Sequence, residues 1–346
     1  MNNKVGKDEV LVYLDLRKPW TQEFCVKIAY FASELEQKIF LPNWTPGSYT
    51  IRDHSQYLYD LRVYSNDKQI KSILKTTNSW QFILNSSGVV IIEYRIIANN
   101  LTVRTSYLEN EFCSLCLSSA IININEKQNY QHRIDIDCKE DWKLYIPNNK
   151  SNVIEFSNYD KLIDTPIHGG HFSEYQVKVK GNTQQIITYG HPENCLSNNI
   201  LKDIQSVCNS VCDLFKTSPP SSNNYLFVIL FQVDTYGGLE HDNSTVIQFD
   251  WRDLTNCDGY RKFLQLIGHE YLHQWNVRRL RPKALINYNY NQAMINEDLW
   301  FVEGITSYYD LFLPFLCGIS NEKELYEDLS NEVSRYLCSS GRSYQS

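Results

Sequence analysis

The pattern of apolar residues changes near the middle of the chain, and this change constrains the fold more than any other feature. From residue 8 to about 172, short segments rich in β-branched and aromatic residues alternate with clusters of Gly, Pro, Asn and Ser. Residues 10–16, 26–31 and 89–97 are examples. No long stretch here repeats apolar residues with the 3.6-residue period of a helix. This half therefore predicts an antiparallel sandwich or saddle of short strands.

From about residue 197 the pattern becomes that of helices with a few strands. Residues 200–215 place apolar side chains on one helical face, and the Pro-Pro pair at 219–220 ends that segment. The following elements are predicted as a strand at 225–231, a Gly-Gly turn, a strand near 245–249, and helices at about 259–275, 297–316 and 322–337. We therefore predict an α+β protein with an antiparallel β domain at 8–172 and a second domain at 173–346.

Charge and composition exclude several kinds of partner. The net charge is −7 and no long Lys/Arg block is present, which argues against a nucleic-acid partner. No apolar stretch is long enough to span a membrane, and the first ten residues lack the apolar core of a signal peptide. We therefore expect a cytoplasmic protein without a membrane partner. The ten cysteines include one C-x-x-C pair, Cys113 and Cys116, with no second pair near it, so free thiols are expected.

The segment His269-Glu270-Tyr271-Leu272-His273 is the clearest chemical motif. Histidines four residues apart lie on one face of a helix, so both imidazoles can reach a single zinc ion. Glu270 lies about 100° round the helix, where it can take a proton from a water that the metal activates. The alternative is an ordinary helix with two hydrogen-bonded histidines. An apolar run at 263–267 and the small Gly268 favour a buried, central helix and hence the metal site.

Two histidines need a third ligand, and Glu303 is the best candidate. It is a single carboxylate within the aromatic-flanked segment 299–309, and burial of an unpaired carboxylate would be costly without a metal. A surface salt bridge is the alternative for Glu303, and Glu297 and Asp298 are the other acids near it. Of these, we expect Asp298 to accept a hydrogen bond from a ligand histidine, through the ring N–H that does not face the metal.

The segment Gly237-Gly238-Leu239-Glu240 suggests where a substrate could lie. Two glycines before an acid indicate an exposed turn or an edge strand that another chain can approach. The Glu240 carboxylate could then pair with the α-ammonium group of a peptide. Taken alone, the segment fits a β-turn with solvated polar residues better.

The order of these motifs resembles the glycyl aminopeptidase family of zinc peptidases. The matching segments are G-G-L-E-H at 237–241, H-E-Y-L-H-Q-W-N-V-R-R-L-R-P at 269–282 and L-W-F-V-E-G-I-T-S-Y-Y at 299–309. Segments 41–53, 103–107 and 159–166 of the first half resemble family segments too. The family belongs to the gluzincin group of peptidases and has a thermolysin-like zinc peptidase domain, which here would be incomplete.

The resemblance implies a role for each motif residue. His269, His273 and Glu303 would bind Zn²⁺ and Glu270 would be the general base. Glu240, with Gly237 and Gly238 beside it, would bind the substrate's free amino terminus. The family's preference implies small amino-terminal residues, Gly and Ala above all.

Family members are usually longer than this chain. They continue with further catalytic-domain helices and a PDZ module, and a tyrosine in an S-Y-Y-x-K-G-like segment stabilises the oxyanion. No such segment occurs here, and loss of one oxyanion donor costs about 10²–10³ in turnover. The expectation is therefore zinc binding with weak or absent peptidase activity. The alternatives are a non-catalytic, peptide-binding scaffold protein and a thermolysin-type endopeptidase.

Overall fold

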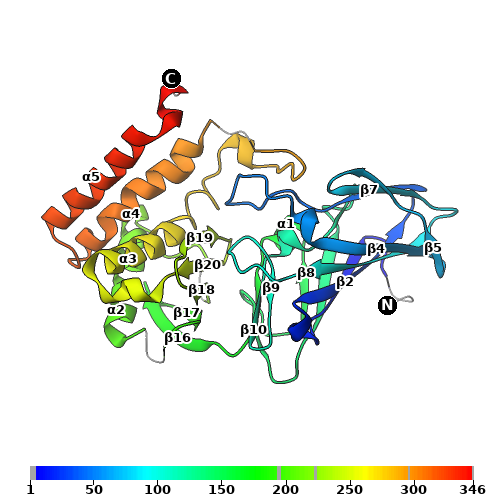
Figure 1. The fold of residues 1–346 in the computed structure, drawn as a ribbon, viewed down its shortest axis with the longest axis horizontal. Helices are drawn as coiled ribbons and strands as arrows, with labels where there is room; N and C mark the ends of the chain where they lie inside the picture. The colour runs from blue at the N-terminus through cyan, green and yellow to red at the C-terminus, as the bar shows by residue number, and fades with distance from the viewer. Residues whose placement is uncertain (1–4, 193–195, 222–223, 295–296, 345–346) are drawn as a thin grey trace. The chain divides into compact units, whose positions relative to one another are not determined.

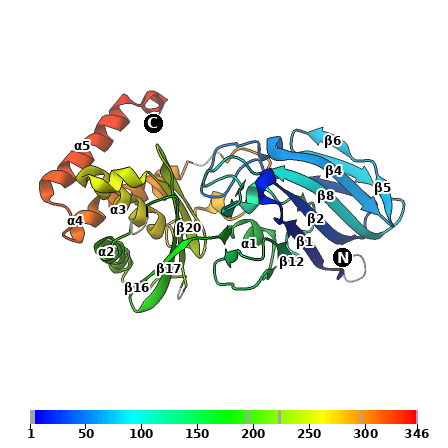
Figure 2. The ribbon, with the colours of Figure 1, turned by 60° about the horizontal axis from the view of Figure 1, so that its bottom comes forward.

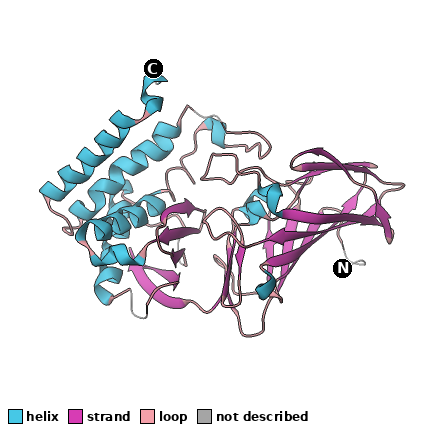
Figure 3. Cartoon of the chain, in the orientation of Figure 1, coloured by secondary structure: helices cyan, strands magenta, loops and turns pink. Residues whose placement is uncertain are grey.

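The computed structural model describes residues 5–192, 196–221, 224–294 and 297–344. The chain forms two compact units. The first contains Met1–Ser173, His241–Ser244 and Asn287–Ile295, and the second contains Glu174–Glu240, Thr245–Ile286 and Asn296–Ser346. Segments 241–244 and 287–295 belong to the first unit although they follow the predicted boundary between residues 172 and 173, so one boundary does not divide the two units. Strands dominate the first unit and helices the second (Figure 3).

The first unit is built on a seven-stranded sheet, several of whose strands are seen side by side in Figure 2. The order is β14-β12-β1-β2-β8-β4-β5. Its strands are β1 (Glu9–Asp15), β2 (Glu23–Ala32), β4 (Leu58–Ser65), β5 (Lys68–Ile70), β8 (Gly88–Ile97), β12 (Gln131–Asp137) and β14 (Val153–Phe156). All pairs are antiparallel, as predicted, except β1 with β12, which are parallel. These two strands are far apart in sequence, so a long crossover connects them.

Two smaller sheets complete the first unit. Their orders are β13-β15-β10-β9 and β11-β3-β7-β6. The strands are β3 (Glu36–Phe40), β6 (Ile73–Thr76), β7 (Ser79–Ile83), β9 (Tyr107–Leu108), β10 (Phe112–Leu115), β11 (Asn123–Ile124), β13 (Lys143–Tyr145) and β15 (Ile167–Gly170). The described residues of this unit also form the short α-helix α1 (Tyr159–Ile163). Alternate residues of β1 and β2 are buried, which is the pattern of strands with one face on a core.

The second unit combines a five-stranded sheet, order β16-β17-β18-β20-β19, with four helices (Figure 1). The elements are β16 (Ser173–Val179), β17 (Asn182–Tyr189), β18 (Leu226–Phe231), β19 (Tyr236–Glu240), β20 (Ser244–Phe249), α2 (Asn198–Phe215), α3 (Cys257–Leu272), α4 (Ile305–Leu316) and α5 (Glu322–Cys338). Helix α3 contacts α2, α4 and the edge strand β19. Every residue of β18 is buried, as its continuous apolar run predicts.

The helices begin where the sequence offers a capping side chain. Ser197 caps α2, Asn256 caps α3, and Asn321 forms a capping box with Glu324 at the start of α5. Two predictions about this unit need correction. The expected Gly-Gly turn is part of strand β19, and the helix expected at 297–316 begins as a π turn at Trp300–Gly304, with α-helical geometry only from Ile305.

The cysteines of the described residues are free thiols, as predicted. Cys113 and Cys116 are both buried, and burial raises the pKa of each thiol. Within the described part of the chain, no helix combines the length and the apolar character that crossing a membrane requires.

Candidate metal centre

His269 lies in the last turn of α3, His273 is the residue that caps its carboxyl end, and their rings lie 4.7 Å apart. Each uses Nδ1 in a hydrogen bond. Nδ1 of His269 donates to Asp310 Oδ2 at 2.7 Å, and Nδ1 of His273 donates to the carbonyl oxygen of Asn276 at 2.6 Å. Both partners accept hydrogen bonds, so they favour the tautomer in which Nδ1 carries the proton. This leaves the Nε2 lone pair of each ring available for a metal.

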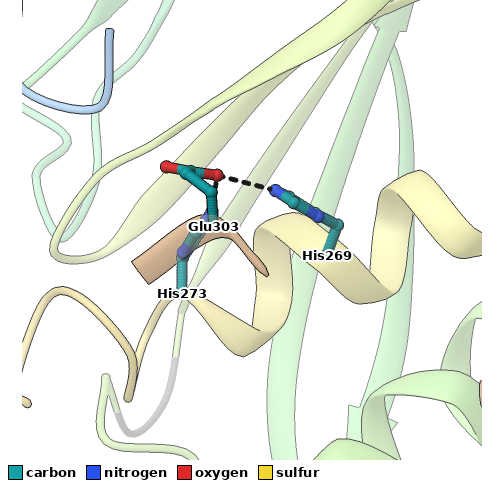
Figure 4. Close-up of side chains that lie close together, drawn as sticks. All are labelled: His269, His273 and Glu303. Atoms are coloured by element: carbon teal, nitrogen blue, oxygen red, sulfur yellow. Dashed lines mark ion pairs between the residues drawn. The ribbon is translucent and has the colours of Figure 1, made fainter. Parts of the chain in front are cut away.

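Glu303 completes a group of three possible ligands. Its Oε2 lies 3.5 Å from His269 Nε2 and 3.7 Å from His273 Nε2, and Figure 4 shows the three side chains converging. Among the described residues, these are the one set of three His, Cys or acidic side chains whose ligand atoms lie within 4.8 Å of one another. Ligands of a tetrahedral zinc at about 2.0–2.1 Å lie roughly 3.3 Å apart. The three residues therefore fit a zinc ion with little rearrangement.

The Glu303 side chain is 39% exposed, so the premise that it is buried was wrong. His273, in contrast, is only 2% exposed. Three protein ligands with one side open to solvent are typical of a catalytic zinc site, whereas structural zinc sites are closed by four. The exposure of Glu303 therefore fits a site that a substrate can enter.

A π turn carries Glu303. The turn spans Trp300–Gly304, and the N–H of Ile305 bonds to the carbonyl of Trp300, five residues earlier. Such turns are rare in helices and occur frequently at functional sites. Five-residue closure inserts one residue into the helix and so changes the direction of the Glu303 side chain relative to a regular α-helix. The aromatic-rich sequence of the segment gives no signal for this geometry.

The carboxylate that holds His269 is Asp310, and the prediction of Asp298 was wrong. The Nδ1 atoms of His269 and His273 donate hydrogen bonds to Asp310 and to the carbonyl of Asn276. The backbone carbonyl of Asp298 accepts hydrogen bonds from the N–H groups of Phe301 and Val302. Burial raises the pKa of Asp310 to about 6, although the hydrogen bond to His269 lowers it. Asp310 follows Glu303 by seven residues. This two-turn spacing, which puts both on one helix face, is the signal that could have identified it.

The surroundings shift the pKa values of the two histidines in opposite directions. Burial lowers the pKa of His269, but its hydrogen bonds to Asp310 and Glu303 and the charge of Glu270 more than offset this, so the pKa lies well above its usual value. Burial lowers the pKa of His273 below its usual value, although the charge of Glu240 opposes the shift. The neutral imidazole is the form that binds a metal, so a zinc ion would have to displace a proton from His269, whereas burial already favours the neutral form of His273.

Glu270 is buried beside strand β19. Its Oε2 accepts a hydrogen bond from Thr245 Oγ1 at 3.4 Å. A Cβ atom added to Gly238 would collide with Glu270 Oε1, so only glycine leaves room for this carboxylate. A Cβ on Gly237 would meet no atom within 4 Å. Gly238 therefore has a packing role that the sequence did not suggest, in addition to its proposed place beside the substrate.

Glu240 ends β19, which is the edge strand of its sheet, the alternative to the β-turn that the segment alone favoured. Its side chain is 3% exposed, and its Oε1 has no hydrogen-bond partner among the described residues. A buried carboxylate oxygen without a partner is costly. A cationic group placed next to Glu240 would offset this cost.

Models of one peptidase family match both parts of the chain. The M61 peptidase N-terminal domain matches residues 12–171, and M61 glycyl aminopeptidase matches residues 262–346. The chain belongs to the M61 glycyl aminopeptidase family. No curated protein matches the chain in sequence.

Solved structures resemble this M61 protein in fold. An aminopeptidase N family protein from Idiomarina loihiensis has 28% sequence identity and a TM-score of 0.84, and the match covers 91% of this chain and 56% of that chain. This chain thus spans just over half the length of that protein. An M1 zinc metallopeptidase from Deinococcus radiodurans has 12% identity and a TM-score of 0.53, with 96% and 76% covered. An M1 zinc metallopeptidase variant bound to L-arginine has 11% identity and a TM-score of 0.54, with 94% and 74% covered. These two distant relatives share the fold: a β domain followed by a thermolysin-like peptidase domain.

Proposed function

We propose that this chain carries the centre of a zinc-dependent aminopeptidase that cleaves after small amino-terminal residues. The convergence of His269, His273 and Glu303 is the observation that carries the proposal. The M61 family match supports a peptidase, and the M1 structures are those of zinc metallopeptidases.

Each residue of the centre has a role that follows from its surroundings. His269, His273 and Glu303 would hold the zinc ion. Bound zinc lowers the pKa of water towards neutrality and polarises the scissile carbonyl. Glu270, fixed between Thr245 and Gly238, accepts a proton from the attacking water and delivers it to the leaving amine.

Glu240 and strand β19 would select the substrate. An extended peptide can add to the exposed edge of a sheet through main-chain hydrogen bonds, and β19 is such an edge. The unpartnered Oε1 of Glu240 would accept a hydrogen bond from the peptide's α-ammonium group. This pairing would favour peptides with a free amino terminus. The preference for Gly and Ala rests on the family alone.

The proposal is tested by hydrolysis of Gly-, Ala- and Leu-arylamides and of N-acetylated peptides, with the zinc content measured in parallel. We expect stoichiometric zinc, cleavage of Gly- and Ala-arylamides and no cleavage of acetylated peptides. Glu240→Gln keeps the side-chain shape but removes the charge. It should raise KM for free-amine substrates about 10- to 100-fold, since a hydrogen bond to a charged group contributes about 1.5–3 kcal/mol.

Other outcomes would favour the alternative functions. Equal cleavage of acetylated and free peptides would indicate an endopeptidase. Stoichiometric zinc and peptide binding without turnover would indicate a non-catalytic peptide-binding protein.

A further inference from the structure

Asn276 contacts both segments that supply the metal ligands. It lies three residues after His273 and is 3% exposed. Its backbone carbonyl accepts the hydrogen bond from His273 Nδ1 at 2.6 Å. Its side-chain Nδ2 donates to the carbonyl oxygens of Phe301 at 2.9 Å and Val302 at 3.3 Å, within the turn that carries Glu303. One residue therefore bonds to a ligand histidine and to the backbone beside the ligand carboxylate.

The chemistry of these contacts fixes the amide in one orientation. Besides the two carbonyls, Nδ2 also lies 3.3 Å from Thr306 Oγ1, which itself donates to the Val302 carbonyl at 2.7 Å. A flipped amide would place Oδ1 against oxygen atoms that accept hydrogen bonds. In the orientation observed, Oδ1 is buried without a hydrogen-bond partner among the described residues. The donor contacts of Nδ2 to the turn therefore outweigh the cost of leaving Oδ1 unsatisfied.

The π turn explains why such a donor is needed. A five-residue closure interrupts the regular four-residue ladder of an α-helix, so carbonyls near the insertion require other donors. Phe301 and Val302 lie inside this turn, and Asn276 supplies a donor to both carbonyls. Without this donor, the turn could return to regular helix and carry Glu303 away from the histidines.

We propose that Asn276 is a positioning residue that ties the Glu303-bearing π turn to His273 and so sets the geometry of the three ligands. The proposal rests on the proposed zinc site, but the tie itself exists between protein groups without the metal. Removal of the amide should loosen the turn in the metal-free protein and weaken zinc binding as a consequence. Loss of a group that orients a metal ligand typically lowers metal affinity about 10- to 100-fold.

The test compares Asn276→Ala with Asn256→Ala. Asn256 is a control of the same residue type: its side chain caps the amino end of α3 by accepting the N–H of Gly259 at 2.7 Å, far along the helix from His273. In the full-length, metal-free chain, hydrogen–deuterium exchange of a peptide spanning 299–307 should be faster in Asn276→Ala and unchanged in Asn256→Ala. Zinc affinity should fall about 10- to 100-fold in Asn276→Ala alone. The visible absorption of the Co²⁺-substituted protein reports ligand geometry and should change in that variant alone.

Thr306→Val provides a second variant of nearly the same shape if Asn276→Ala does not fold. It removes the Thr306 donor to Val302 and should accelerate exchange of the same peptide by a smaller factor. Unchanged exchange in the folded variants, or equal changes in Asn276→Ala and Asn256→Ala, would overturn the proposal. If the unmodified chain binds no zinc, the proposed function fails, while the exchange experiment still decides the role of Asn276.

Discussion

In the second unit, His269 and His273 each use Nδ1 in a hydrogen bond and turn Nε2 towards Glu303. In the first unit, His54 and His168 are fully buried, and neither ring nitrogen of either residue has a hydrogen-bond partner among the described residues. Burial lowers the pKa of His54 to about 4 and that of His168 to about 3. Burial therefore does not identify a metal ligand. The features that support the proposed metal ligands are a fixed Nδ1 and a carboxylate facing Nε2.

The largest expected difference is between His273→Leu and His168→Leu. His273→Leu removes one of three ligands, so zinc content should fall from stoichiometric to trace and activity should be lost. His168→Leu removes a buried imidazole whose nitrogens have no hydrogen-bond partner among the described residues, and this variant should keep its zinc. Metal analysis of the two purified, folded variants checks this. Stoichiometric zinc in His273→Leu would contradict the distinction between the two kinds of histidine.

Glu270→Gln separates catalysis from metal binding within the second unit. The amide keeps the shape of the side chain but cannot accept a proton, so kcat for Ala-arylamide should fall about 10²–10⁴-fold. Zinc content should not change, because Glu270 is outside the ligand group. Steady-state kinetics with parallel metal analysis measure both quantities. A variant that keeps its full kcat would remove Glu270 from the role of general base.

Asp310→Asn tests the anchoring of His269 and is paired with Asp298→Asn. The amide at position 310 still reaches His269 Nδ1 but lacks the charge, so zinc affinity should fall about 10- to 100-fold. Asp298→Asn should change it less than twofold, because the Nδ1 atoms of His269 and His273 donate to Asp310 and to the carbonyl of Asn276. Competition with a zinc chelator gives both affinities. A larger loss of zinc affinity in Asp298→Asn than in Asp310→Asn would instead support the sequence prediction that Asp298 anchors a ligand histidine.

The smallest effect concerns the pH dependence of stability in the first unit. His54 and His168 have folded pKa values of about 4 and about 3, because of burial and of the nearby charges of Arg52 and His241, respectively. Both values lie below the unfolded value of about 6.5, so the stabilising contribution is present above pH 6.5 and is lost as the pH falls towards 4.

At pH 5 the expected loss is about 2 kcal/mol for each histidine. Urea unfolding of the full chain at pH 7.5 and pH 5 measures the loss, and His54→Leu should remove its share. The same pH dependence in the variant would mean that His54 does not contribute.

The parts of the site that are local in sequence could be predicted. The i, i+4 spacing of His269 and His273 and the acid between them required only a helix, and α3 is one. The edge strand that carries Glu240 was only the less favoured alternative to a β-turn when the adjacent glycines were considered alone. For the fold, apolar periodicity identified the β-rich half and the helices, because burial of one face produces that pattern in any context.

What could not be predicted depends on contacts between distant segments or on irregular backbone. Strands β1 and β12 pair in parallel although they are far apart in the sequence, and the apolar pattern within each strand does not indicate which other strand it pairs with. The π turn that carries Glu303 accepts hydrogen bonds from Asn276, which precedes it by more than twenty residues. The anchor of His269 is Asp310, a contact between helices α3 and α4, although the two-turn spacing of Asp310 from Glu303 was an available signal.

Anomalous X-ray scattering at the zinc edge, from crystals of the full chain purified with zinc, tests the central claim most directly. We predict a single strong peak about 2.0–2.2 Å from His269 Nε2, His273 Nε2 and a Glu303 carboxylate oxygen. A folded protein without a peak at these three residues, or with its zinc bound elsewhere, would contradict the account.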